Sequence, residues 1–270
     1  MSNDNWGDVA RIGIFIVGAE AVPEAEWWAM APPGVSIHAS RVSAPTPWAK
    51  WTPDGMDLDV APDVERGCAQ LAALAPSAVV IAHSSSSIAG GSGWDEAVVE
   101  KLATYLPSAT KITTNSIDCV LALRARGVTR PFLVFPPWFG DAIISRGVDY
   151  FAEKGLPAAA HIRQIPEAKW REFRPEELYG ALMHVEQRTD VLLDQIVAAC
   201  PKDADGVLIA GTGVRCVRII ANLEAALGRP VVTANQASLW RCLSLAGVDS
   251  AITGYGALLQ MPRDLTQGVP

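Results

Sequence analysis

The feature that most constrains the fold is a repeated alternation of short β-rich runs with segments of helical periodicity. The β-rich runs have the length of buried strands and lie at 12–17, 35–42, 78–82, 111–113, 132–135, 206–210, 230–233 and 250–253. Segments whose apolar residues recur every three or four positions follow most of them, at 96–105, 117–126, 141–154, 175–199, 217–227 and 237–246. This order predicts an α/β fold with parallel sheets covered by helices on both faces.

The chain also contains an internal repeat. Thr113 and Asn115 recur with the same spacing as Thr233 and Asn235, and an apolar helix follows in both copies. Each copy is preceded by a β-rich run that ends in a loop of small residues, SAVVIAHSSSS in the first and DGVLIAGTGVR in the second. A duplication predicts two similar lobes with a cleft between them. We assign residues 1–114 and 235–270 to lobe 1 and residues 115–234 to lobe 2.

Composition limits the class of function. Half of the residues are apolar and 19% are charged, as in a folded globular protein. The net charge of −7, with scattered basic residues, provides no surface for nucleic-acid phosphates or for an anionic membrane. The first residues lack the cations of a signal peptide, and no apolar run reaches the ~20 residues of a membrane span. We therefore expect a cytoplasmic protein, and its apolar content suggests a homo-oligomer.

The cysteines indicate neither disulfides nor a metal site. Their number is odd, and they form no CxxC pair or His-rich cluster. They are Cys68, Cys119, Cys200, Cys216 and Cys242. We expect Cys216, in the first turn of a predicted helix, to pack in the interior.

The first loop with candidate chemistry begins at His83. Ser84 and Ser85 follow it within a four-serine run, and a Gly-rich stretch comes next. Ligands of parallel sheets bind at the carboxyl ends of the strands, where this loop begins. The hydroxyl and backbone N–H groups of such a loop suit a carboxylate or an oxyanion, and an imidazole exchanges protons near neutral pH.

The second loop comprises Gly211, Thr212, Gly213 and Arg215 and precedes a helix. It half-matches the dinucleotide pattern GxGxxG, but the next strand ends without the acid that would hold a ribose. A small oxyanion held by Thr212 and Gly213, with Arg215 as an added carboxylate ligand, is the simpler interpretation.

Glu20 lies in the turn after the first predicted strand. If it faces the cleft with His83, the two form an acid–base pair.

Trp48 and Trp51 lie in a Pro-rich loop that could close over the cleft, and Trp138 follows two prolines at another strand end. Tryptophans at one cleft would suit a flat or aryl substrate.

With these loops defined, the chain resembles the maleate isomerase and arylmalonate decarboxylase branch of the aspartate/glutamate racemase superfamily. The similarity covers nearly the whole chain and is carried by RIGIFIVGAEAVPEAE, AHSSSSIAGG, ITTNSIDCVLALRARGV, FLVFPPW and, most specifically, GTGVRCVRIIANLEAALGRPVVTANQASLW. It implies two Rossmann-like lobes related by a pseudo-twofold axis, with the active site between them. It also implies a small-molecule substrate, in most cases a carboxylate, and no cofactor. Members use one or two cysteines, one per lobe, to move protons or attack carbon.

This chain departs from the family pattern at both cysteine positions, which are occupied by His83 and Gly211. Glu20 stands where the N-terminal turn usually carries a substrate-binding Asn. The resemblance still implies binding roles for Thr114, Asn115, Asn235 and Trp138, the last replacing a substrate-binding Tyr. A symmetric two-thiol mechanism is therefore excluded.

Together these features predict a cofactor-independent enzyme that transfers protons beside a carboxylate or carbonyl, of the isomerase, decarboxylase or lyase type. His83 is the predicted general acid or base, tuned by Glu20. Two alternatives remain open at this point. In one, His83 and Glu20 activate water in a hydrolase or ring-opening enzyme; in the other, the protein has lost catalysis and binds a small acid.

Overall fold

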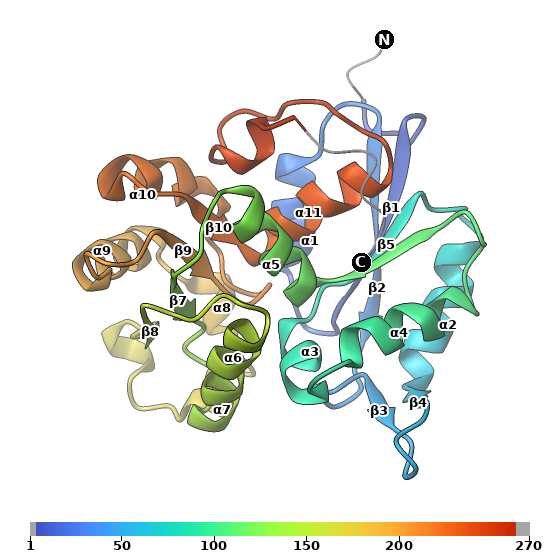
Figure 1. The fold of residues 1–270 in the computed structure, drawn as a ribbon, viewed down its shortest axis with the longest axis horizontal. Helices are drawn as coiled ribbons and strands as arrows, with labels where there is room; N and C mark the ends of the chain where they lie inside the picture. Colours follow the sequence, from blue (N-terminus) through green and yellow to red (C-terminus); the bar gives the residue numbers. More distant parts are fainter. Residues whose placement is uncertain (1–3, 263–270) are drawn as a thin grey trace.

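The computed structural model describes residues 4–262 and confirms the predicted α/β fold with two parallel sheets (Figure 1). The first sheet has the order β2-β1-β5-β6 and consists of β1 (Ala10–Val17), β2 (Val35–Val42), β5 (Ala78–Ile81) and β6 (Lys111–Thr114). The second has the order β10-β9-β7-β8 and consists of β7 (Pro131–Phe135), β8 (Ala160–Arg163), β9 (Gly206–Ile209) and β10 (Val231–Thr233). Within each sheet the order is second, first, third, fourth strand of that lobe, so the internal repeat of the sequence is also a repeat of topology.

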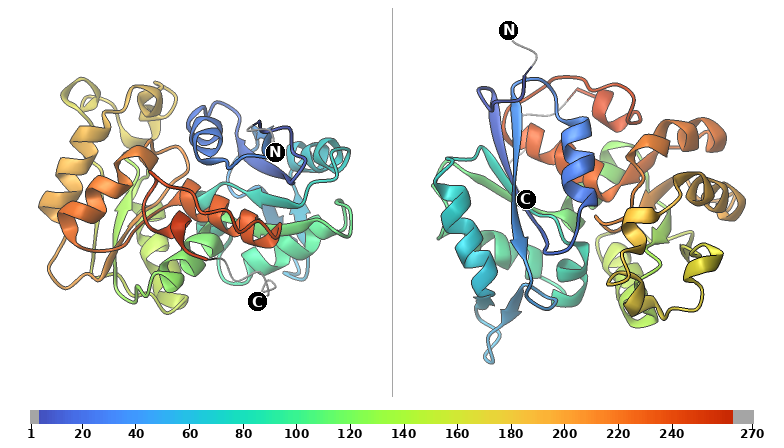
Figure 2. Two further views of the ribbon diagram at one scale, coloured as in Figure 1. Left: turned by 90° about the horizontal axis from the view of Figure 1, so that it is seen from above. Right: turned by 180° about the vertical axis from the view of Figure 1, so that it is seen from behind.

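Helices cover both faces of each sheet. On the first sheet, α2 (Pro62–Ala72) and α4 (Trp94–Ala103) pack on one face, while α1 (Val22–Met30) and α11 (Ala234–Leu245) pack on the other. On the second sheet, α5 (Asn115–Ala125) and α6 (Asp141–Glu153) face α9 (Thr189–Ala199) and α10 (Ile220–Leu227) across the strands. The views in Figure 2 show the two layered lobes side by side.

The two lobes are joined at their centre by α5 and α11. Each of these helices follows the last strand of one sheet, and the two pack against each other. Asn115 Nδ2 donates to Ala234 O at 2.8 Å, and Ser238 Oγ donates to Asp118 Oδ2 at 2.7 Å. One hydrophobic cluster also contains strand residues of both sheets. The lobes therefore form one packed body.

Several local predictions were wrong. Residues 250–253 are not a strand, and the predicted helix 175–199 is divided into α7 (Pro175–Leu178), α8 (Met183–Glu186) and α9, with Leu182 in the left-handed region at φ 63° between α7 and α8. The four-serine run is not a loop but begins the short helix α3 (Ser84–Gly90). Strand β8 and the hairpin of β3 (Ala49–Trp51) and β4 (Leu58–Val60) carry too few apolar residues to be recognised.

Three short 3-10 helices complete the described chain. They are η1 (Ala168–Trp170), η2 (Val217–Ile219) and η3 (Leu258–Gln260). Between residues 4 and 262, none of the helices has the length and apolar character needed to cross a membrane.

Candidate active site

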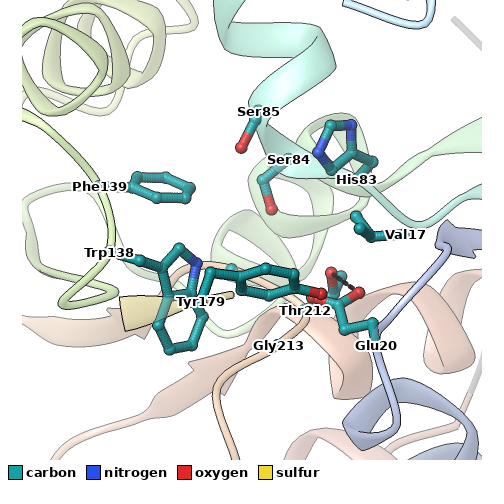
Figure 3. Close-up of a pocket in the computed structure, with 11 residues that line it drawn as sticks. Val17, Glu20, His83, Ser84, Ser85, Trp138, Phe139, Tyr179, Thr212 and Gly213 are labelled. Atoms are coloured by element: carbon teal, nitrogen blue, oxygen red, sulfur yellow. Dashed lines mark hydrogen bonds between the residues drawn. The ribbon is translucent and has the colours of Figure 1, made fainter. Parts of the chain in front are cut away.

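A cavity of about 160 Å³ lies between the lobes, at the carboxyl ends of the strands (Figure 3). Lobe 1 contributes Val17, Glu20, His83, Ser84 and Ser85. Lobe 2 contributes Trp138, Phe139, Tyr179, Gly211, Thr212 and Gly213. The cavity is smaller than the ~300–1,000 Å³ of typical drug-sized sites, so it suits a small ligand.

His83 is held from two sides. Its Nδ1 lies 2.8 Å from Ser86 Oγ, which also accepts the backbone N–H of Trp48 at 3.0 Å. The Trp48 ring stacks on the imidazole with a centroid distance of 4.1 Å and an interplanar angle of 15°. Burial lowers the pKa of His83 to about 3, so the ring is neutral at physiological pH. Nε2 has no hydrogen-bond partner within residues 4–262 and remains available to a ligand.

Glu20 supplies the carboxyl group of the cavity. Its side chain is buried, and this burial raises its pKa to about 7. The Thr212 hydroxyl lies 3.3 Å from Glu20 Oε2 but also 3.1 Å from Ala82 O. Because one hydroxyl hydrogen serves one acceptor at a time, Thr212 only partly offsets the effect of burial. Glu20 is therefore the group of this cavity that changes its protonation near neutral pH.

Two glycines of the lobe 2 loop lie where an added Cβ would have to displace a neighbouring side chain. Gly211 has a left-handed φ of 87°, and a Cβ there would lie 2.4 Å from Pro136 Cγ. A Cβ on Gly213 would lie 2.4 Å from Glu20 Oε1 and 3.1 Å from Trp138. A cysteine at position 211 would thus require a shift of the backbone and of Pro136.

Gly213→Ala is expected to displace the Glu20 carboxyl group and to lower the free energy of unfolding by about 1–3 kcal/mol, the usual cost of overpacking. Thermal denaturation measures the loss. Gly180→Ala is the matched control, because a Cβ there meets only Glu177 O at an ordinary 3.7 Å. Equal melting temperatures for both variants would contradict the close approach of Gly213 to Glu20.

The two predicted binding asparagines lie behind the loops and do not line the cavity. Asn115 Oδ1 accepts the Ser84 hydroxyl at 2.6 Å, and Asn235 Nδ2 donates to Thr212 O at 2.9 Å. Ser84 and Thr212 occupy corresponding positions in the two lobes, so each asparagine holds the loop of its own copy of the repeat. Thr114 is also outside the cavity, since its hydroxyl donates to buried Asp95.

Arg215 is not brought together with His83 and Glu20. It lines a second, separate cavity beside α1, where its guanidinium donates to Val185 O at 3.3 Å. The predicted contact of Arg215 with a substrate carboxylate is therefore not available in the cavity of His83.

The loop that carries Trp48 and Trp51, expected to close over the cleft, also differs from expectation. Trp48 is buried against His83, and Trp51 Nε1 donates to Gly90 O at 3.0 Å.

Three lining residues were not found from the sequence: Val17, Phe139 and Tyr179. Phe139 follows Trp138 directly, so the same strand-end argument could have included it. Tyr179 lies in the segment predicted as one helix, which concealed its direction. Its hydroxyl is buried beside Glu20 without a hydrogen bond of normal geometry in the described chain, and its ring packs 5.6 Å from that of Trp138.

The cysteines and the acids of the described residues do not assemble a metal site. No group of three His, Cys, Asp or Glu side chains with that geometry occurs between residues 4 and 262. All five cysteines are free thiols. Cys216 is buried, and burial raises its pKa well above the usual value, as expected for a thiol that packs.

Comparison with known proteins places these features in a family. A family model described as arylmalonate decarboxylase matches residues 45–259. The chain belongs to the arylmalonate decarboxylase family. The arylmalonate decarboxylase of Bordetella bronchiseptica is 29% identical over 212 residues, which cover 77% of this chain and 80% of that protein.

Solved structures of a maleate isomerase and of arylmalonate decarboxylase share the fold of this chain. The maleate isomerase Iso of Pseudomonas putida S16 superimposes with a TM-score of 0.76 at 21% identity, covering 93% of this chain and 98% of that one. Unliganded arylmalonate decarboxylase gives a TM-score of 0.71 at 23% identity, with 93% and 98% covered. The predicted branch is confirmed, and an enzyme of the isomerase or decarboxylase kind is supported. These comparisons give no support to a hydrolase.

Proposed function

We propose that this protein is a cofactor-independent decarboxylase of a small aryl-substituted malonate, with Glu20 as the proton donor. The observation that carries this proposal is the position of the buried Glu20 carboxyl group in the inter-lobe cavity, where its pKa is raised to about 7. A general acid is most effective when its pKa lies near the working pH. The division of the chain into lobes at 114/115 and 234/235 is kept as part of this proposal.

The reaction needs no external oxidant or reductant. The bond between C2 and one carboxylate breaks, CO₂ leaves, and the electron pair forms an enediolate with the remaining carboxylate. The protonated carboxyl group of Glu20 then transfers its proton to C2, and Glu20 regains a proton from water. The products are CO₂ and an arylacetate.

In this proposal His83 has a different role from the one expected from sequence. A ring that is neutral at pH 7 is a weak acid and, with a pKa near 3, a weak base. A neutral imidazole is, however, a good hydrogen-bond donor to a developing oxyanion. We therefore assign proton transfer to Glu20 and stabilisation of the enediolate to His83, aided by the hydroxyl groups of Ser85 and Tyr179.

The distribution of side chains in the cavity supports an aryl substrate. The rings of Trp138 and Phe139 lie across the cavity from His83 and Glu20, with Tyr179 between them (Figure 3). One end is therefore aromatic and the other polar. No Lys or Arg is among the described residues that line the cavity, so a departing carboxylate is not held there by a cation.

Turnover of phenylmalonate in D₂O tests the function. We expect CO₂ release and phenylacetate with one deuterium at C2, observed by proton NMR without added metal or cofactor. Maleate serves as the comparison substrate, because a structure of a variant of the Pseudomonas isomerase contains maleate. Formation of fumarate alone would replace the decarboxylase proposal with an isomerase, and binding of both acids without conversion would indicate an inactive binding protein.

A further inference from the structure

Glu26 is a second buried carboxylate, outside the cavity of His83 and not used in the proposed reaction. It lies on α1, is 5% exposed, and follows Glu20 by six residues along the chain. Its Oε1 accepts the backbone N–H groups of Cys216 at 2.7 Å and Val217 at 3.0 Å. Its Oε2 accepts Asn235 Nδ2 at 2.7 Å. All these donors come from residues that follow the strands of the second sheet.

The carboxyl groups of Glu20 and Glu26 contact the two ends of one loop, residues 211–217. Glu20 meets Thr212 and Gly213 at the beginning of the loop, and Glu26 meets Cys216 and Val217 at its end. Asn235 connects the two contacts, because the Nδ2 that donates to Glu26 also donates to Thr212 O at 2.9 Å. Trp27 Nε1 donates to Oδ1 of the same Asn235 side chain at 3.3 Å.

We infer that Glu26 is a positioning residue, which fixes the loop 211–217 of lobe 2 against α1 so that Thr212 and Gly213 are held beside Glu20. This inference rests on the role proposed for Glu20. Burial raises the pKa of Glu26 to about 7, and the donors that compensate for its lost hydration all belong to the loop and to Asn235. Side chains that orient a reacting group commonly act from behind it in this way.

Glu26→Gln tests the inference. The new amide NH₂ group would face either Asn235 Nδ2 or the two backbone N–H groups, so at least one of the contacts of Glu26 is lost. We expect kcat for phenylmalonate to fall by about 10²-fold, as when a reacting group is misplaced by about 1 Å, while KM changes little. Hydrogen–deuterium exchange of amides 211–217 should accelerate in the same variant.

The matched control is Glu224→Gln. Glu224 also bridges separate segments through backbone donors, Ala257 N at 2.9 Å and Val231 N at 3.4 Å, but it lies outside the cavity. We expect its kcat and the exchange of amides 211–217 to equal those of the wild type. If Glu26→Gln does not fold, Glu26→Asp carries the same expectation, because it keeps the charge and shortens the reach by one methylene.

The outcomes separate the inference from the proposed function. Exchange at 211–217 that stays at the wild-type rate in the Glu26 variant would overturn the positioning role, whatever the substrate. Equal loss of kcat in the Glu224 control would also overturn it, since the effect would then be general destabilisation. Wild-type protein that fails to convert phenylmalonate would refute the decarboxylase, while faster exchange in the Glu26 variant would still support the positioning of the loop.

Discussion

Glu20→Gln is expected to lower kcat for phenylmalonate by about 10³-fold, within the range that general acid catalysis contributes. The amide has nearly the same shape as the carboxyl group, but its N–H protons are far too weakly acidic to be transferred to C2. Steady-state assays of CO₂ release measure the loss. Glu96→Gln is the control, because it removes an exposed carboxylate that pairs with Lys154 and does not line the cavity. A Glu20 variant that retains wild-type turnover would exclude Glu20 as the proton donor.

The pH profile of kcat extends this prediction. Burial raises the pKa of Glu20 to about 7, so the carboxyl group carries its proton below that pH and loses it above. Decarboxylation that uses this proton should be fastest below about pH 7 and should decline as the pH rises. The decline should be absent from the residual activity of Glu20→Gln. A rate that instead increases through pH 7 would indicate that Glu20 acts as a base.

His83→Ala is expected to lower kcat by about 10²-fold, the effect of removing one donor from an oxyanion site. The reason is the loss of the Nε2 hydrogen bond to the enediolate, and the alanine also leaves Trp48 and Ser86 without their partner. His83→Gln, whose amide nitrogen can take the position of the imidazole Nε2, restores a donor and should recover part of the rate. The measurement is kcat for phenylmalonate, with KM recorded alongside it.

The pH dependence separates the two possible roles of His83. A donor with a pKa near 3 adds no inflection between pH 5 and 9, so the profile of His83→Ala should keep the shape set by Glu20. Loss of an inflection near neutral pH in this variant would restore the acid–base role that the sequence suggested for His83.

The parts of the fold that were predicted correctly are those with a local signal. Strands of a parallel sheet are buried on both faces, so β1, β5 and β9 read as apolar runs, and the loops after them are found by counting. His83, Glu20 and Gly213 follow such strands, and the structure brings them into one cavity. In contrast, β8 is an edge strand with partly exposed residues and lacks this signal.

The parts that could not be predicted depend on contacts distant in sequence. The family resemblance implied a binding role for Asn235, but its amide is occupied by Glu26, Thr212 and Trp27. Tyr179 enters the cavity only because α7 ends before it and the chain turns at Leu182. The sequence also suggested a charge-changing imidazole, and only the packing of Trp48 on His83 within a buried site shows why the ring stays neutral.

The contact between α5 and α11 bears on how substrates are chosen. The chain passes between the lobes at α5 and at α11, and these two helices are hydrogen-bonded to each other through the pairs Asn115–Ala234 and Ser238–Asp118. A wide hinge motion of the lobes would break these buried polar contacts. Substrate would then bind to a preformed cavity, without a large closure of the two lobes. Small changes of volume at Trp138 or Gly213 would shift the range of accepted acids more than changes at any distant hinge.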